Sequence, residues 1–392
     1  MMWRKLTIHG GMSMANTHAN GCRAPNGLTS GAILGNNRKR LQKKPPPPEQ
    51  QAVKLRDIAE AAGVTIATAS RSLNGSYGVN PLTRERVMEA ASRLNYRPNR
   101  LARGLVTGRS QILGLIISDI RNPFFSEVAR GVEDAAYSAG CDVVLCNSDL
   151  DPQKQNHYIA SLMAKSVDGI IMNSVTALDQ PEQERLAMSG VPVVLLNRFT
   201  SLAQFSTISA DNEQGGRLAA EYFLKMGHTR LAHLTGPRHH GNLSQRAKGF
   251  LQAVREGNLA ASVIVAHGNH TLSGGYAMGL KLFREKQDIT AIFAANDALA
   301  FGVLKAALES KVKIPQDVSL IGFDNVDLAA IVHPPLTTIH QSKYEIGEAA
   351  VNVLLRLAKA KDKSPENRVL GVELIERESV RNLKSKGAKV SR

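Results

Sequence analysis

The chain has 392 residues, 43% of them hydrophobic and 21% charged, so its length allows two or three domains with ordinary globular cores. No apolar run approaches the length of a membrane span, and the first residues lack the continuous apolar stretch typical of a signal peptide. The three cysteines, Cys22, Cys141 and Cys146, have no metal-like spacing and suit a reducing compartment. These features argue against a membrane protein and against an exported one, and we expect a cytoplasmic, nucleoid-associated protein.

The net charge of +15 is concentrated towards the two ends of the chain. Residues 1–110 contain 18 Lys and Arg against 5 Asp and Glu, and residues 381–392 contain 5 basic residues and no acidic one. The remaining residues, 111–380, have a net charge of −3. Positive charge on the N-terminal part is expected of a module that neutralises nucleic-acid phosphates, whereas the long middle part is suited to another task.

Residues 1–52 form a leader that lacks hydrophobic periodicity and contains a basic segment followed by four prolines, Pro45 to Pro48. This composition predicts a disordered segment and a short polyproline spacer. Two interpretations have equal weight: a basic arm that adds non-specific DNA affinity, and residues that result from a misassigned start site. A cleaved targeting peptide is less favoured.

Residues 55–73 have the pattern of two short helices joined by a tight turn. Apolar residues recur at helical spacing from Leu55, Gly63 suits a left-handed turn, and Thr65 is placed to cap a second helix that ends near Leu73. In such a helix-turn-helix, the first residues of the second helix reach base edges in the major groove. Hydroxyl groups suit phosphates, and Arg71 is long enough to reach a guanine. The predicted DNA-contacting residues of this helix are Thr65, Ile66, Ala67, Thr68, Ser70 and Arg71.

A third helix is predicted with Asn80 as its cap and Pro81 at its first position. The segment 95–105, Asn-Tyr-Arg-Pro-Asn-Arg-Leu-Ala-Arg-Gly-Leu, follows it. Together with Asp-Ile-Ala at 57–59, Ala-Gly-Val at 62–64 and Ser-Arg-Ser-Leu-Asn at 70–74, this run resembles the DNA-binding headpiece of the LacI/GalR family of bacterial repressors. The alternative is a generic three-helix bundle or protein-interaction module.

The resemblance implies a headpiece at 53–98 and a hinge at 99–110, carried by a homodimer that binds a palindromic operator. In the family, a short hinge helix forms on the operator, and its leucine wedges into a minor-groove step and bends the DNA. Leu105 holds that position in this chain. The alternative is a linker leucine that packs on the core.

The resemblance also assigns roles to individual headpiece side chains. Ile66 and Ala67 lie at base-reading positions and are expected to touch thymine methyl groups, while Arg71 supplies the polar contact. The further DNA-contacting residues that it implies are Asn74, Tyr96, Asn99, Arg100, Ala102 and Leu105.

From Gln111 onward, short apolar runs alternate with helical stretches, which is typical of parallel sheets covered by helices on both faces. The predicted strands are Ile112–Ile117, Val143–Cys146, Gly169–Met172, Val193–Leu196, Arg230–Leu234, Ser262–Ala266, Ala291–Ala294 and Val318–Phe323. Two runs of this kind predict two similar subdomains, and residues 335–341 are interpreted as a return crossover between them. The predicted fold class is therefore α/β. An all-α headpiece precedes a periplasmic-binding-protein-like core of two doubly wound parallel-sheet subdomains at 111–380, and a basic tail follows at 381–392.

In open parallel sheets, ligands bind outside the carboxyl ends of the strands, where this chain has carboxylate, amide, guanidinium and aromatic side chains. That combination suits a sugar or similar polyol, which needs hydrogen bonds and an apolar ring contact. The resemblance sharpens three of them: Arg246 in Arg-Ala-Lys-Gly-Phe, Asn296 in Ala-Asn-Asp and Asp324 in Gly-Phe-Asp. The predicted effector-binding residues are Asp119, Phe124, Phe125, Asn173, Asn197, Arg246, Asn296 and Asp324.

Each of these assignments has a purely structural alternative. Asp297 is as well suited to capping the following helix as to touching a ligand, and Phe125 is as well suited to the core. Arg246 and Asp324 are also compatible with a solvated surface pair.

The sequence offers little support for catalysis. His267 and His270 lack the partner spacing of a zinc site, no glycine-rich nucleotide-binding pattern follows a strand, and no nucleophile–base pair is evident. We therefore predict no metal, no cofactor and no enzymatic activity.

The overall prediction is a homodimeric, sequence-specific DNA-binding transcription regulator, favoured as a repressor, whose operator affinity depends on a small sugar-like effector. The alternatives are a solute-binding protein of the transport type, which shares such a core but lacks a headpiece, a sugar-metabolising enzyme, and an activator. A dimer is favoured over a tetramer because the tail lacks the leucine heptads of a tetramerising coil.

Overall fold

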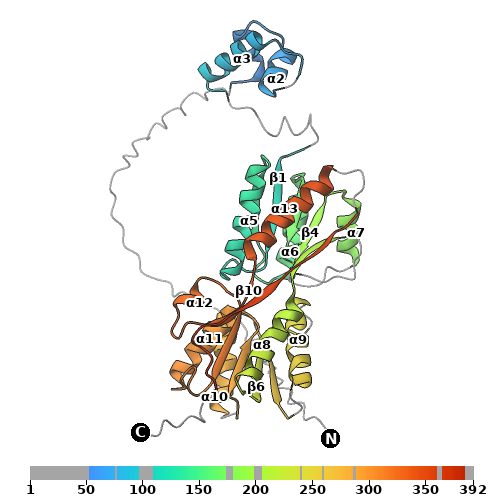
Figure 1. Ribbon diagram of the computed structural model, residues 1–392. Helices are drawn as coiled ribbons and strands as arrows, with labels where there is room; N and C mark the ends of the chain where they lie inside the picture. Colours follow the sequence, from blue (N-terminus) through green and yellow to red (C-terminus); the bar gives the residue numbers. More distant parts are fainter. Residues whose placement is uncertain are drawn as a thin grey trace, which may run out of the picture. The chain divides into compact units, whose positions relative to one another are not determined.

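The computed structural model describes residues 53–75, 77–96, 109–173, 180–197, 205–238, 241–257, 260–285, 288–359 and 364–384. The chain forms two compact units, one ending at Tyr96 and the other beginning at Arg97 (Figure 1). The predicted leader and most of the predicted hinge lie outside the described residues. The DNA contacts predicted at Asn99, Arg100, Ala102 and Leu105 lie there too.

The first unit contains three short helices, α1 (Leu55–Ala61), α2 (Ile66–Leu73) and α3 (Pro81–Arg93), which we call the headpiece. Gly63 follows α1 with a left-handed φ of 64°, the turn that the sequence predicts. Thr65 caps α2 by accepting a hydrogen bond from the Thr68 amide, and Asn80 caps α3 in the same way from Leu82. The three helices enclose a small apolar core formed by Ile58, Ala59, Ala62, Ala69, Val87, Ala90 and Ala91.

The second unit, the core, contains two six-stranded sheets (Figure 1). The first has the order β11-β5-β4-β3-β1-β2 and the second the order β12-β10-β9-β8-β6-β7. All neighbouring strands pair in parallel except β10 and β12. The strands of the first sheet are β1 (Ile112–Ile117), β2 (Asp142–Asn147), β3 (Gly169–Met172), β4 (Val193–Leu196), β5 (Ser206–Ala210) and β11 (Asn367–Leu370). Those of the second are β6 (Arg230–Thr235), β7 (Ser262–His267), β8 (Ala291–Ala294), β9 (Ser319–Asp324), β10 (Thr337–Gln341) and β12 (Val372–Ile375).

Helices cover both faces of each sheet, because successive residues of a buried strand point to opposite sides. In the first subdomain, Leu113 and Leu115 of β1 pack towards α5 (Phe124–Ser138) and α13 (Lys343–Lys359), and Ile116 packs towards α6 (Pro152–Ala164) and α7 (Gln180–Met188). In the second subdomain, one face carries α8 (Asn212–Lys225) and α9 (Gly241–Gly257). The other carries α10 (Leu272–Arg284), α11 (Asp297–Glu309) and the short α12 (Leu328–Ile331). The predicted pair of doubly wound subdomains is confirmed.

Three segments of the described chain pass between the subdomains: β5 into α8, β10 into α13, and β11 into β12. We call them the first, second and third crossovers. They lie side by side, because the Asp211 amide donates to the Leu370 carbonyl oxygen at 2.9 Å and Gln341 pairs with Val372. The carboxyl ends of both sheets therefore face the same region.

Two predictions about the C-terminal part of the core need correction. Residues 335–341 are more than a connection, because Thr337–Gln341 is a complete strand of the second sheet and the crossing follows it. The predicted basic tail also begins too early. The Arg381 amide donates to Ser319 Oγ at 3.0 Å and the Leu383 amide donates to the Met226 carbonyl oxygen at 2.8 Å, so the core reaches Lys384. A side-chain hydroxyl on β9 and a carbonyl oxygen at the end of α8 give this segment partners that its basic composition does not reveal.

Candidate DNA-binding surface and effector cleft

The amino-terminal end of α2 presents the headpiece residues that the sequence predicts to contact DNA. Ile66 is 49% exposed although it is apolar, and Thr65 and Ala67 beside it are exposed. Ala67 and Arg71 lie four residues apart, on one exposed face of the helix. A short helix that exposes both an isoleucine and an arginine is suited to a groove that offers both methyl groups and hydrogen-bond acceptors.

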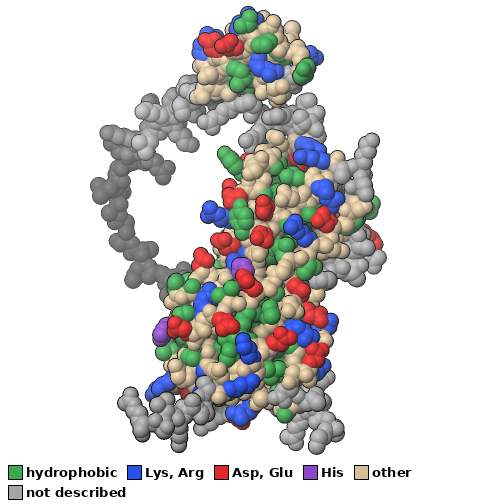
Figure 2. Space-filling view, viewed as in Figure 1, with side chains coloured by type: hydrophobic (Ala, Val, Ile, Leu, Met, Phe, Trp, Pro, Cys, Tyr) green, Lys and Arg blue, Asp and Glu red, His purple; other side chains and the backbone are tan. Residues whose placement is uncertain are grey.

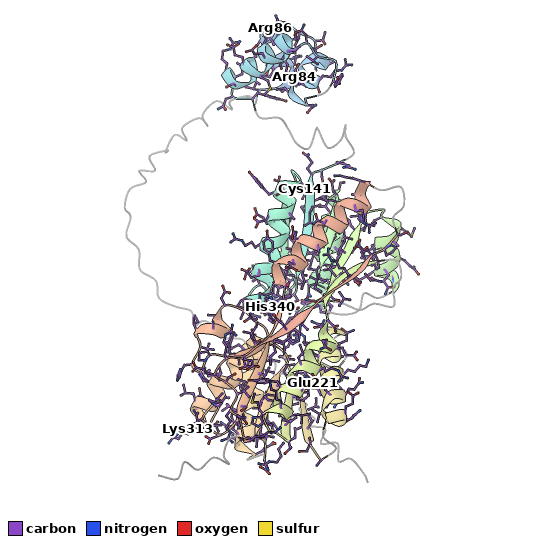
Figure 3. All side chains as sticks on the ribbon, viewed as in Figure 1. Arg84, Arg86, Cys141, Glu221, Lys313 and His340 are labelled. Carbon is purple, nitrogen blue, oxygen red and sulfur yellow. The ribbon has the colours of Figure 1, made fainter. Side chains whose placement is uncertain are left out.

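The remaining predicted residues of the headpiece have structural partners of their own. The hydroxyls of Thr65 and Thr68 lie 3.0 Å apart, and Asn74 Nδ2 donates to Ser70 Oγ at 3.4 Å. Tyr96 is half-buried and packs against the headpiece core. The structural role of Thr65 is thus to cap α2, and its contact with DNA remains a prediction. The third helix contains three more arginines, Arg84, Arg86 and Arg93, of which Figure 3 labels the first two.

The core contains a cleft at the carboxyl ends of both sheets, with an empty volume of about 380 Å³ that includes space open to solvent. Seven of the eight predicted effector-binding residues line this cleft: Phe124, Phe125, Asn173, Asn197, Arg246, Asn296 and Asp324. Asp119 does not. Its carboxylate instead accepts hydrogen bonds from the backbone amide, Nε and Nη2 of Arg121 at 2.9–3.0 Å. The lining residues absent from that prediction are Ser118, Asn122, Asn242, Leu243, His270 and Gln341.

Arg246 is the most deeply buried charged side chain in the cleft, with 2% of its surface exposed. Its Nε donates to Asn212 Oδ1 at 2.8 Å, its Nη1 donates to the Ala295 carbonyl oxygen, and its guanidinium lies 3.5 Å above the Phe323 ring. Burial lowers the pKa of this guanidinium to about 10, although the nearby Asp324 carboxylate favours the charged form. At neutral pH Arg246 therefore remains a fixed cation in the wall of the cleft.

Asp324 supplies the opposing charge, with its Oδ1 3.6 Å from Arg246 Nη1. Oδ1 also accepts a hydrogen bond from Gln341 Nε2 at 2.6 Å. Burial raises the pKa of Asp324 to about 6, against the opposing influence of the Arg246 charge. The two residues thus form a buried pair that lines the cleft, and the predicted alternative of a solvated surface pair is wrong.

The backbone at Asp324 is strained, with φ values of 113° at Asp324 and 51° at Asn325. Lys343 Nζ holds this turn by donating to the carbonyl oxygens of both residues, at 3.0 and 2.8 Å. Asn325 Nδ2 lies 3.1 Å from Nδ1 of His340, which Figure 3 labels near the centre of the core. Strain that neighbouring groups maintain in this way is typical of a functional site.

The structure distinguishes the roles of the neighbouring residues Asn296 and Asp297. Asn296, not Asp297, caps α11, by accepting a hydrogen bond from the Leu299 amide at 2.8 Å. Asp297 is fully buried and accepts hydrogen bonds from Thr338 Oγ1 at 2.6 Å and the Val326 amide at 2.9 Å. Burial and the Asp324 charge raise the pKa of Asp297 to about 8. Neither a cap nor a cleft residue, Asp297 ties the strained turn to β10.

The first subdomain contributes the apolar part of the cleft. Phe124 and Phe125 meet edge to face, with ring centroids 5.0 Å apart, and both also belong to the hydrophobic core of that subdomain. Asn173 follows β3 and donates through Nδ2 to the Leu196 carbonyl oxygen at the end of β4 at 3.5 Å. Asn197 follows β4 and accepts through Oδ1 from the Ala210 amide at the end of β5 at 3.5 Å. The cleft has aromatic faces on one side, which suit the apolar face of a polyol. On the other side it has a buried ion pair with amides, which suits the hydroxyl groups of a polyol.

Two negative observations apply to the part of the chain that the structure describes. It contains no group of three His, Cys, Asp or Glu side chains that could hold a metal ion. None of its helices is both long and apolar enough to cross a membrane.

On the face of the core seen in Figure 2, acidic and basic side chains are interspersed.

Comparisons with known proteins agree with this division of the chain. The family model of bacterial regulatory proteins of the lacI family matches residues 54–99, and that of the periplasmic binding protein-like domain matches residues 204–380. Catabolite control protein A from Priestia megaterium is 36% identical over 306 residues, which cover 78% of this chain and 92% of that protein.

Solved structures show the same likeness. The Lac repressor dimer bound to operator and the anti-inducer ONPF has a TM-score of 0.76 and 28% identity, covering 84% of this chain and all of that one. A LacI family transcriptional regulator from Enterococcus faecium with bound ribose has a TM-score of 0.63 and 31% identity, covering 69% of this chain and 99% of that one.

A helix-turn-helix headpiece joined to a two-subdomain ligand cleft defines a ligand-responsive DNA-binding protein. The chain belongs to the LacI family of bacterial regulatory proteins. It is therefore a sequence-specific DNA-binding transcription regulator of the repressor type, with an effector-binding core.

Proposed function

We propose that this protein is a transcriptional repressor whose operator affinity is set by an uncharged sugar bound between the two subdomains of the core. The observation that carries the proposal is the buried Arg246–Asp324 pair, which faces the Phe124 and Phe125 rings across the cleft. Because the pair compensates its own charge, it offers hydrogen bonds to hydroxyl groups without requiring a charged ligand. The ribose bound to the Enterococcus faecium regulator supports the same class of ligand.

On the DNA side, we propose that α2 enters the major groove with Ile66 and Ala67 against thymine methyl groups and Arg71 on a base edge. A homodimer places two such helices on a palindromic operator, as the dimeric, operator-bound Lac repressor illustrates. The protein then acts on the nucleoid DNA in the cytoplasm, without catalysing a reaction. Asn74 and Tyr96, and the residues predicted beyond Tyr96, remain proposed DNA contacts.

The proposal is tested by isothermal titration calorimetry of the full chain with neutral pentoses, hexoses and disaccharides, including D-ribose and cellobiose. We expect one of them to bind the wild type, and Asp324→Ala to abolish that binding while operator binding without sugar persists. A sugar that binds both proteins equally would place the ligand elsewhere. If the sugar strengthens operator binding by the wild type and not by Asp324→Ala, the effector acts as a corepressor. Circular dichroism distinguishes either loss from loss of the fold.

A further inference from the structure

Two of the three crossovers place a buried amide side chain directly on the Arg246–Asp324 pair. Asn212 is the first residue of α8, immediately after the first crossover, and is 1% exposed. Its Oδ1 accepts the hydrogen bond from Arg246 Nε, and its Nδ2 donates to the Ala210 carbonyl oxygen on β5 at 2.9 Å. Asn212 is not among the residues that line the cleft. It therefore connects the cationic member of the pair to the strand that comes from the other subdomain.

Gln341 makes the equivalent connection for the anionic member. It is the last residue of β10, at the start of the second crossover, and it is fully buried. Gln341 lines the cleft, its Nε2 donates to Asp324 Oδ1, and its buried Oε1 has no hydrogen-bond partner among the described residues. Two residues later, Lys343 begins α13 in the first subdomain and binds the Asp324 turn through its carbonyl oxygens. An unpartnered buried oxygen is costly, and a ligand hydroxyl in the cleft could satisfy it.

Amides suit this position because each one accepts and donates at once without adding charge. Asn212 accepts from Arg246 and donates to the first crossover, whereas Gln341 donates to Asp324 and keeps an acceptor for the cleft. Any shift of the ion pair on ligand binding must therefore change hydrogen bonds made by the two connections that determine how the subdomains are oriented.

We propose that Asn212 and Gln341 are positioning residues that form a hinge clamp, through which occupancy of the cleft is transmitted to the orientation of the two subdomains. The inference rests on the proposed function, because it requires an effector in this cleft. Transmission of this kind requires a ligand that interacts differently with the two orientations, and the clamp makes that difference depend on the ion pair. Residues that line the cleft away from the crossovers contribute affinity but not transmission.

The experiment measures the ratio of operator dissociation constants with and without a saturating sugar from the panel that includes D-ribose and cellobiose, by fluorescence anisotropy. For the wild type we expect a ratio of about 5- to 150-fold, the usual range of coupling between sites. Asn212→Ala, which lies outside the cleft lining, should reduce the ratio to below about 2-fold, a nearly complete loss of that coupling, with sugar-free operator affinity unchanged. Gln341→Met should reduce the ratio in the same way at sugar concentrations that calorimetry shows to saturate the variant. Asn212→Asp, which keeps the acceptor for Arg246 Nε but loses the donor to the Ala210 carbonyl oxygen, should lose the ratio as Asn212→Ala does.

The matched control is Asn173→Ala, because Asn173 lines the cleft from the end of β3 rather than from a crossover. It should weaken sugar binding yet keep the wild-type ratio once the sugar saturates the protein. If Asn212→Ala does not fold, Asn212→Ser serves in its place, since its shorter hydroxyl does not reach Arg246 Nε.

Wild-type ratios in folded Asn212 and Gln341 variants at saturating sugar would overturn the clamp while leaving the proposed function intact. The clamp would also be overturned if the Asn173 control reduced the ratio of operator dissociation constants as much as the clamp variants do. A wild type that binds operator but responds to no sugar of the panel would contradict the proposed function, and the inference with it.

Discussion

His233 lies on β6 of the second sheet and is fully buried against aromatic rings. Its ring stacks on Phe293 at 4.8 Å and on Phe250 at 5.5 Å between centroids, and its Nδ1 lies 3.0 Å from the Phe293 carbonyl oxygen. Burial lowers the pKa of His233 to about 4, because the charged form loses its hydration. In the unfolded chain the same side chain takes up a proton near pH 6.5. Between pH 6.5 and about pH 4, protonation of His233 therefore favours the unfolded state.

The stability of the core should accordingly depend on His233 below neutral pH. The contribution is complete above pH 6.5 and is lost as the pH falls towards about 4, and a shift of this size amounts to about 3 kcal/mol. Asp297 and Asp324 act in the opposite direction, since their raised pKa values favour the folded state as the pH falls. We therefore compare urea unfolding of the wild type with that of His233→Gln from pH 7 to pH 4. The difference between them should shrink as the pH falls, and parallel profiles would contradict the account.

Arg71 offers a second test at the scale of a single residue. Arg71→Ala should weaken binding to a specific operator by about 1–3 kcal/mol and relax discrimination at one position in each half-site. The measurement is operator affinity for a set of single-base substitutions at fixed salt concentration. A uniform loss across all sequences, with discrimination unchanged, would assign Arg71 to a phosphate instead.

The side chains of the cleft were largely predictable, because seven predicted residues follow strands or open helices that the apolar pattern locates. Ser118 and Gln341 obey the same strand-end rule and were within its reach. Asn212 was not, because its role depends on a hydrogen bond to Arg246, 34 residues away in sequence. Asp119 is the opposite case, a residue that was predicted to line the cleft and does not. Its carboxylate is bound by a neighbouring arginine, and the spacing of apolar residues in the sequence does not reveal such a contact.

Helices α8 and α9 pack so closely that their contact depends on missing side chains. A Cβ atom at Gly216 would clash with the Arg246 carbonyl oxygen, and one at Gly249 would clash with the Glu213 carbonyl oxygen. Backbone carbonyls cannot rotate away as side chains do, so the helices would have to separate. The position of Arg246 in the cleft thus depends on the small residues of the neighbouring helix.

Gly216→Ala is therefore expected to act on stability and on ligand binding together. Overpacking of this kind costs about 1–3 kcal/mol, and the displaced α9 should also weaken sugar binding. Thermal unfolding and calorimetry measure the two effects. Gly371→Ala is the control, because a Cβ atom there meets nothing within 4 Å. Equal behaviour of the two variants would show that the helices tolerate the extra methyl group.

At the scale of elements, prediction succeeded where strands are continuously apolar. β3, β4 and β8 have the predicted bounds, since each is a run of four buried residues. β5 was missed because its sequence, Ser-Thr-Ile-Ser-Ala, is mostly polar although the strand is buried. β11 and β12 are as short as β3, β4 and β8, but each contains charged or polar residues and is largely not buried, so neither forms a continuous apolar run. The helix α13 has buried residues at helical spacing, such as Ile346, Ala350 and Leu354, so its position is detectable from the spacing of apolar residues in the sequence.

At the scale of the whole molecule, function depends on communication between the effector cleft in the core and the headpiece. The cleft lies between subdomains joined by three adjacent crossovers in the described chain, so a change in their relative orientation is the simplest consequence of ligand binding. The strand-by-strand pattern predicts the two subdomains. It does not predict which residues connect them, because crossovers depend on contacts between segments that are distant in sequence.

The central claim, that a sugar in the cleft controls operator binding, is tested most directly by titrating a complex of the full chain and its operator with the panel of neutral sugars. For the wild type, one sugar should change the operator dissociation constant by about 5- to 150-fold, and Asp324→Ala should show no change. A sugar that binds the core with a measurable affinity, yet leaves operator binding unaltered at saturation, would contradict the account.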